Sequence, residues 1–179
     1  MFAALVQGPL IRLVPVGVLL VALQRTIFVE ITVAGVIVQV ATAFAAAAGV
    51  VGGSERGALA GFVVGVIYDL AEGLPLGSTA LAMIVAGVVA GAVGLITVEP
   101  QWWLAALFVG LGTAAGELMV PTVRLFTGEA DPYDARLWLI VPVVGVAGAV
   151  MSPLLLPLAR WCLRLKQAEW KAPADDASV

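Results

Sequence analysis

Three glycines, Gly57, Gly61 and Gly65, recur at every fourth position of an otherwise apolar run. The next step of four residues reaches Asp69. Positions four apart lie one above another on an α-helix, so this spacing predicts a helix with a smooth stripe that ends in a carboxylate. Such a stripe lets two helix backbones approach closely, which matters in lipid because no hydrophobic force drives apolar helices together there. We therefore expect a membrane helix packed along its glycines, with Asp69 facing protein or water.

The chain is too apolar for a soluble protein of its size. Of its 179 residues, 62% are hydrophobic and 12% are charged, and the mean hydropathy is +1.10. Soluble domains carry about 25% charged residues. Six to eight soluble helices could not hide this much apolar surface, so the composition predicts an all-α polytopic membrane protein. The first residues, Met1 to Ile11, contain no Lys or Arg and fit a cleavable signal peptide badly.

The charged and reactive residues exclude several classes of function. The formal net charge is −3 and no broad basic surface exists, which argues against nucleic-acid binding. The chain has no His, which excludes His-dependent triads and the usual zinc sites. Its single cysteine, Cys162, cannot form an internal disulfide. No phosphate-binding loop or nucleophile elbow is present, so we expect no enzyme, metal or cofactor.

Six apolar segments are expected to cross the membrane. The expected spans cover residues of about 9–24, 28–51, 57–70, 78–98, 102–126 and 137–162, in a single domain of residues 1–166. The third span is short, about 21 Å, unless the preceding turn at residues 52–56 winds into helix. A polar loop is expected at residues 127–134, and residues 167–179 are expected to form a disordered cytosolic tail.

Six spans place both ends of the chain on one side of the membrane, and the basic residues indicate which side. The side of the two ends receives Arg12, Arg56, Arg160, Arg164, Lys166 and Lys171, and the other side receives Arg25, Arg124 and Arg136. Because basic residues are enriched in cytoplasmic loops, this distribution predicts that both termini lie in the cytosol.

Asp69 has two interpretations that the residues leave open. It is either a wet carboxylate at an outer helix end, or a buried acid that caps or pairs with a neighbouring loop or a partner protein. A third interpretation fails. The Tyr68–Asp69 pair is similar to that of intramembrane aspartyl proteases, but those enzymes need two apposed aspartates. The other candidates, Asp131 and Asp134, fall in a polar loop rather than in an apolar run.

Three further polar residues, Gln39, Glu117 and Arg124, interrupt the apolar spans. Glu117 lies fifteen residues into the fifth span, and a charge at such depth suggests function by default. Alternatively, it bonds a polar side chain such as Gln39 and only fixes helix packing. Arg124 lies two turns further along, too far for a direct pair without a bend near Pro121. Few aromatic or hydrogen-bonding residues are expected to converge on the outer half, which disfavours a small-molecule site.

A longer pattern surrounds the glycine stripe: a G-x-x-x-G-F-x-x-G-x-x-x-D-L run, a short Pro/Gly turn and an L-G-x-x-A-L restart. In this pattern the chain resembles the rod shape-determining protein MreD family. The resemblance covers about a quarter of the chain. The matching residues are Gly57, Gly61, Phe62, Gly65, Asp69, Leu70, Leu76, Gly77, Ala80 and Leu81, followed by Gly87 and Gly91.

The resemblance implies a non-enzymatic subunit of the bacterial cell-elongation machinery in the plasma membrane. Such a subunit binds MreC and lies near MreB, RodA and a class B penicillin-binding transpeptidase. The implied fold is similar to the six-helix substrate-binding subunit of energy-coupling-factor vitamin transporters. Asp69 and the motif glycines, including Gly77, Gly87 and Gly91, are then helix-packing or partner-interface residues. The alternative function is a substrate-binding membrane subunit of a vitamin-type transporter.

Overall fold

The computed structural model describes residues 10–28, 32–33, 35–96, 100–126 and 136–163. These residues form a helical bundle with the composition of a multi-pass membrane protein. Five helical stretches are long and apolar enough to cross a membrane: Leu10–Ile27, Val40–Glu72, Ser78–Leu95, Trp102–Phe126 and Leu137–Leu163. The α-helices are α2 (Leu10–Leu23), α3 (Val40–Gly52), α4 (Ser54–Glu72), α5 (Ser78–Gly91), α6 (Trp102–Phe126) and α7 (Leu137–Leu163). The π-helical turn η1 (Gln24–Phe28) follows α2, and the 3-10 turn η2 (Ala92–Leu95) follows α5.

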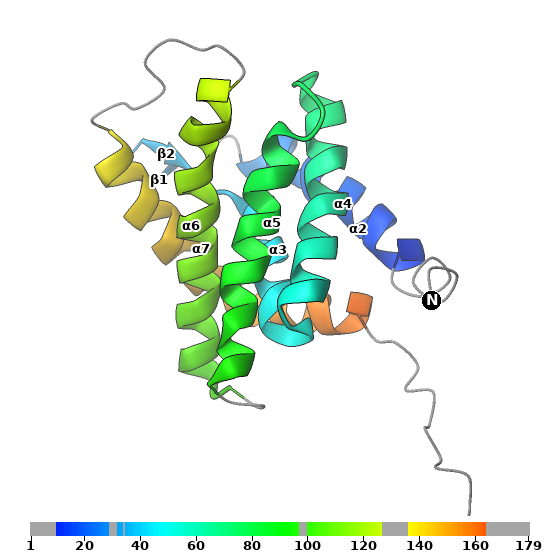
Figure 1. Ribbon diagram of the computed structural model, residues 1–179, viewed down its shortest axis with the longest axis vertical. Helices are drawn as coiled ribbons and strands as arrows, with labels where there is room; N and C mark the ends of the chain where they lie inside the picture. The colour runs from blue at the N-terminus through cyan, green and yellow to red at the C-terminus, as the bar shows by residue number, and fades with distance from the viewer. Residues whose placement is uncertain (1–9, 29–31, 34, 97–99, 127–135, 164–179) are drawn as a thin grey trace, which may run out of the picture.

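Helix α3 lies at the centre of the bundle. Helices α4, α5 and α6 stand side by side in front of it, and α7 crosses the bundle obliquely (Figure 1). Helix α3 contacts all four of these helices, and every residue from Val40 to Val50 is buried. This segment is rich in alanine, and small side chains let four neighbouring helices approach one backbone. Helix α2 packs on the outer side of α4.

The bundle has two ends, which we name after their turns. At the Asp69 end, residues 73–77 join α4 to α5; at the Gly53 end, Gly53 joins α3 to α4. Arg12, near the start of α2, donates a hydrogen bond of 3.1 Å to the carbonyl of Trp161, near the end of α7. A Cβ atom on Gly52 would meet Leu163. The start of α2, the end of α7 and the α3–α4 turn therefore share the Gly53 end.

The second expected span, residues 28–51, is helical only in its second half. Helix α3 begins at Val40, and the strands β1 (Thr32–Val33) and β2 (Val36–Ile37) form an antiparallel pair before it. The buried Gln24 side chain explains where α3 starts. Its Nε2 donates to the Val38 carbonyl and its Oε1 accepts from the Val40 N–H, both at 2.8 Å. With 13 residues, α3 is about 20 Å long, shorter than a hydrocarbon core of about 30 Å.

The turn expected at residues 52–56 is almost entirely helical instead. Only Gly53 separates α3 from α4, with φ +80°, a backbone conformation that favours glycine. Helix α4 therefore has 19 residues and is about 28 Å long, more than the 21 Å expected for residues 57–70. The long apolar stretch Val40–Glu72 is thus bent back on itself into two packed helices.

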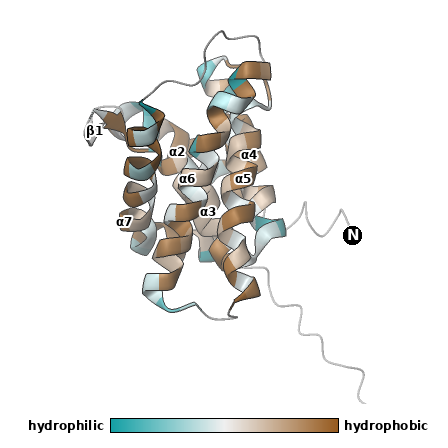
Figure 2. Ribbon diagram, turned by 60° about the vertical axis from the view of Figure 1, so that its left-hand side comes forward, coloured by the Kyte–Doolittle hydropathy of each residue, from teal (hydrophilic) through white to brown (hydrophobic). Residues whose placement is uncertain are grey.

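The remaining helices lie close to their expected positions. Helix α6 begins and ends at residues 102 and 126, and α7 runs from Leu137 to Leu163 although it contains three prolines. Many large apolar side chains are exposed. The ribbon is hydrophobic along most of the helices, and its hydrophilic residues gather mainly near the helix ends (Figure 2). Some expectations fall outside the described residues: the polar loop at 127–134, the tail at 167–179, and the bases Arg164, Lys166 and Lys171.

Candidate functional site at the Asp69 end

The glycine stripe of α4 lies against the backbone of α5. A Cβ atom added at Gly57, Gly61 or Gly65 would fall within 3.0 Å of backbone atoms of Gly87, Met83 or Ala80, respectively. The contact is reciprocal, because a Cβ atom on Gly87 would meet Gly57 and one on Gly91 would meet Ser54. Backbone atoms cannot move aside as a flexible side chain can. The four-residue spacing therefore serves a close contact between two consecutive helices of the same chain.

Asp69, at the end of the stripe, caps the next helix. Its side chain is fully buried, so the alternative of a wet carboxylate is wrong. Oδ2 accepts hydrogen bonds from the Gly77 N–H at 2.8 Å and the Ala80 N–H at 3.4 Å. Oδ1 accepts from the Thr79 N–H at 3.0 Å and the Ser78 hydroxyl at 3.2 Å. A carboxylate at this position satisfies N–H groups that the first turn of α5 leaves unpaired and lies at the positive end of its dipole.

The turn between α4 and α5 has the residues that this cap requires. Gly73 and Gly77 adopt positive φ angles of +68° and +98°, which residues with a Cβ atom rarely adopt. The Asp69 carbonyl accepts hydrogen bonds from the N–H groups of Gly73 and Leu74 and so closes the end of α4. One residue thus ends one helix through its backbone and begins the next through its side chain.

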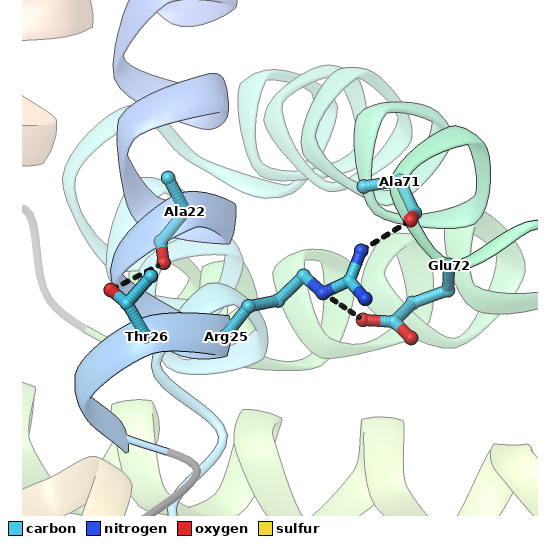
Figure 3. A network of polar contacts seen from close by, with 5 residues as sticks. All are labelled: Ala22, Arg25, Thr26, Ala71 and Glu72. Atoms are coloured by element: carbon cyan, nitrogen blue, oxygen red, sulfur yellow. Dashed lines mark hydrogen bonds and ion pairs between the residues drawn. The ribbon is translucent and has the colours of Figure 1, made fainter.

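Arg25, in the π-helical turn η1 that follows α2, links this turn to the end of α4 (Figure 3). Its Nε lies 3.2 Å from Glu72 Oε1, and its Nη1 donates a hydrogen bond to the Ala71 carbonyl. The Ala71 carbonyl is one of the last carbonyls of α4, which an α-helix leaves without an internal partner. On the same turn as Arg25, the Thr26 hydroxyl donates to the Ala22 carbonyl at 2.8 Å. The ion pair is half-exposed, so we expect it to contribute little stability.

A polar cavity of about 300 Å³ lies beside this turn, between α3, α4, α5 and α6. It brings together Gln39, Glu117 and Arg124, the three polar residues that interrupt the apolar spans. Its other polar lining residues are Thr42, Tyr68, Glu72 and Thr79. The expectation that few hydrogen-bonding residues converge here is therefore wrong. Tyr68 directly precedes the motif residue Asp69 on α4, so the cavity lies beside the motif.

Gln39 does not serve as the hydrogen-bonding partner suggested for Glu117. Its Oε1 accepts a hydrogen bond from the Thr42 hydroxyl at 3.5 Å, within the first turn of α3. Within the described part of the chain, no three acidic or cysteine side chains lie close enough to hold a metal ion. The cavity offers hydroxyls, an amide and charges of both signs, which suits recognition of a small polar group.

Comparisons with known proteins give no relative for this chain. No protein-family model matches the sequence, and neither a curated protein nor a solved structure matches it significantly.

Proposed function

We propose that this chain is a non-enzymatic subunit of the bacterial cell-elongation complex that binds MreC and helps to control peptidoglycan synthesis and cell shape. The other proposed neighbours are MreB, RodA and a class B penicillin-binding transpeptidase. The MreD-like motif supports the proposal, because its residues act as one unit. The small and acidic members fix α4 against α5, which gives the motif a physical reason for its spacing.

The exposed large apolar residues of the motif give the strongest support for the binding of MreC. Phe62, Leu70, Leu76 and Leu81 have exposed fractions of 51%, 66%, 70% and 54%. None of them is needed to fill the interior of this chain. Phe62 in particular lies on α4, directly after a glycine that is in backbone contact with α5. We propose that a transmembrane helix of MreC covers the Phe62 side of α4, since shape matching drives helix association in lipid.

We also propose six membrane passes, with α3 as a half-length pass and both termini in the cytosol of a bacterial cell. Three of the described bases, Arg12, Arg56 and Arg160, lie at the Gly53 end, and three, Arg25, Arg124 and Arg136, lie at the Asp69 end. Arg164, Lys166 and Lys171 follow α7 in the sequence and raise the first group to six, which favours the cytosolic side for the Gly53 end. The Asp69 end then faces the periplasm, where the soluble part of MreC begins.

Site-specific photo-crosslinking in native membranes tests the proposal. A photoreactive phenylalanine at position 62 is expected to capture MreC. The control replaces Val150, an exposed residue on α7, and is expected to capture it far less. Deletion of the gene should also round or swell rod-shaped cells. If position 62 captures no elongation protein while the intact chain is recovered, the proposal is wrong.

One observation favours a second candidate function. The polar cavity between α3 and α6 lies in the proposed outer half, where a substrate-binding subunit of a vitamin-type transporter would hold its substrate. This function predicts a tightly bound small molecule in the purified protein and a partner linked to a cytosolic ATPase. Mass spectrometry of the extracted protein and growth on defined vitamins would separate the two candidates.

A further inference from the structure

The polar cavity adjoins a second one at the same end of the bundle. The inner cavity, of about 300 Å³, lies between α3, α4, α5 and α6. The outer cavity, of about 330 Å³, lies between the α4–α5 turn, the start of α5 and the end of α6. Leu74, Thr79, Val120 and Arg124 line both. Because they share these residues, the two cavities are neighbours, and we refer to the pair as one path.

Charge is ordered along this path. Glu117 lines only the inner cavity, and Arg124 lines both cavities at their junction. These two residues are seven positions apart on α6, a separation of about 10 Å along the helix. The outer cavity adds the apolar side chains of Pro75 and Val123. From inside to outside, a ligand would meet a negative group, a positive group and an apolar surface.

The other carboxylates that the structure describes at this end already have defined roles. Asp69 accepts its hydrogen bonds from the first turn of α5, and Glu72 forms an ion pair with Arg25. Glu117 is therefore the carboxylate of α6 that faces the inner cavity opposite the amide and hydroxyl groups of Gln39 and Thr42. A carboxylate at such depth in an apolar bundle is costly unless it faces a polar cavity or a cation.

We propose that this path binds the phosphoethanolamine headgroup of a membrane phospholipid. The ammonium group lies at Glu117, the phosphate lies at Arg124, and the acyl chains leave over Pro75 and Val123. Arginine recognises phosphate through paired N–H groups, and the primary ammonium offers three donors to a carboxylate. The proposal requires only that the bundle lies in a membrane, so it can fail or hold independently of MreC binding.

Lipid binding by the unaltered protein is the first test. The full chain is purified in detergent and titrated with phosphatidylethanolamine, phosphatidylcholine and phosphatidylglycerol, and the complexes are counted by native mass spectrometry. We expect phosphatidylethanolamine to be retained about tenfold better than either other lipid, because only it carries a primary ammonium. Soluble glycerophosphoethanolamine, which lacks acyl chains, should bind at least tenfold more weakly. Equal retention of the three lipids overturns the proposal, and equal binding of the soluble headgroup overturns the role of the outer cavity.

Two variants then assign the charged groups. Glu117→Gln should lower binding of phosphatidylethanolamine about tenfold and leave that of phosphatidylglycerol unchanged. Arg124→Gln should lower binding of both lipids in parallel, because both carry a phosphate. The matched control, Glu55→Gln, removes an exposed carboxylate at the Gly53 end and should change neither. If a folded Glu117→Gln variant keeps its lipid preference, the proposal is wrong. If that variant does not fold, the headgroup series on the unaltered protein decides alone.

Discussion

The α4–α5 contact runs from the Gly53 end to the Asp69 end, where the cavity lies beside it, and the contact and the cavity are built in opposite ways. Along α4, residues without side chains bring two backbones together, and the buried polar group, Asp69, has all its bonds within the chain. Across α6, the close contact ends at Gly116, which lies against Ala82 and Thr42. Beyond Gly116, the α6 residues Glu117, Val120 and Arg124 line the cavity.

This difference separates residues that stabilise the fold from residues that can contact a ligand or a partner protein. A glycine in backbone contact with another helix has no surface left for a partner protein. A carboxylate that accepts four hydrogen bonds within the chain has no oxygen left for a ligand. Glu117 instead lines the cavity, and the Phe62 side chain is 51% exposed. We therefore expect the motif's small and acidic residues to stabilise the fold. We expect its large apolar residues to bind a partner protein and the cavity to bind a ligand.

The largest effect is expected from adding a side chain at the α4–α5 contact. In Gly61→Leu the new atoms would meet the backbone of Met83, which cannot move aside. We expect a loss of more than about 3 kcal/mol of stability, or no folded protein. Unfolding of the purified protein in mixed micelles, followed by circular dichroism, measures the change. The matched control is Gly94→Leu, since a Cβ atom at Gly94 meets nothing within 4 Å. Equal effects at both positions would contradict the role of backbone contact.

Removing the Asp69 carboxylate should have the next largest effect. Asp69→Ala leaves the Gly77, Thr79 and Ala80 N–H groups without their acceptor in a buried site. We expect a loss of about 2–4 kcal/mol in the same unfolding assay, and about half of that for Asp69→Asn, which keeps one acceptor oxygen. Glu55→Gln, at the exposed first turn of α4, should cost less than about 1 kcal/mol. A stable Asp69→Ala variant would show that the cap is dispensable.

The parts of the fold that could be predicted depend on local spacing. The stripe from Gly57 to Asp69 has a helical period, and the limits of α6 follow from Trp102 and the apolar run after it. The late start of α3 could not be predicted in this way. It depends on Gln24, a residue fourteen positions or more away from the groups it bonds. The cavity likewise needs α3 and α6 to meet, and no spacing within one segment encodes that contact.

The ion pair between η1 and α4 should contribute less stability than the cap. Arg25→Gln removes the pair with Glu72 and weakens the bond to the Ala71 carbonyl. We expect a loss of up to about 1 kcal/mol, because half-exposed pairs are screened by water and salt. The loss should shrink when unfolding is measured at high salt. A cycle with Glu72→Gln isolates the coupling between the two side chains. A coupling well above 1 kcal/mol would place this pair among the structural contacts instead.

The smallest effect is expected on the cavity side, and it tests the comparison most directly. Val120→Leu adds one carbon atom to a side chain that lines both cavities, where Gly61→Leu adds its atoms against a backbone. Because space is available, we expect the stability of Val120→Leu to stay within about 0.5 kcal/mol of the original protein, compared with the 1–3 kcal/mol typical of overpacking in a filled core. The same unfolding assay measures it. A loss of stability as large as that of Gly61→Leu would mean that no open volume exists beside Glu117. The distinction between the filled α4–α5 contact and the open cavity would then be wrong.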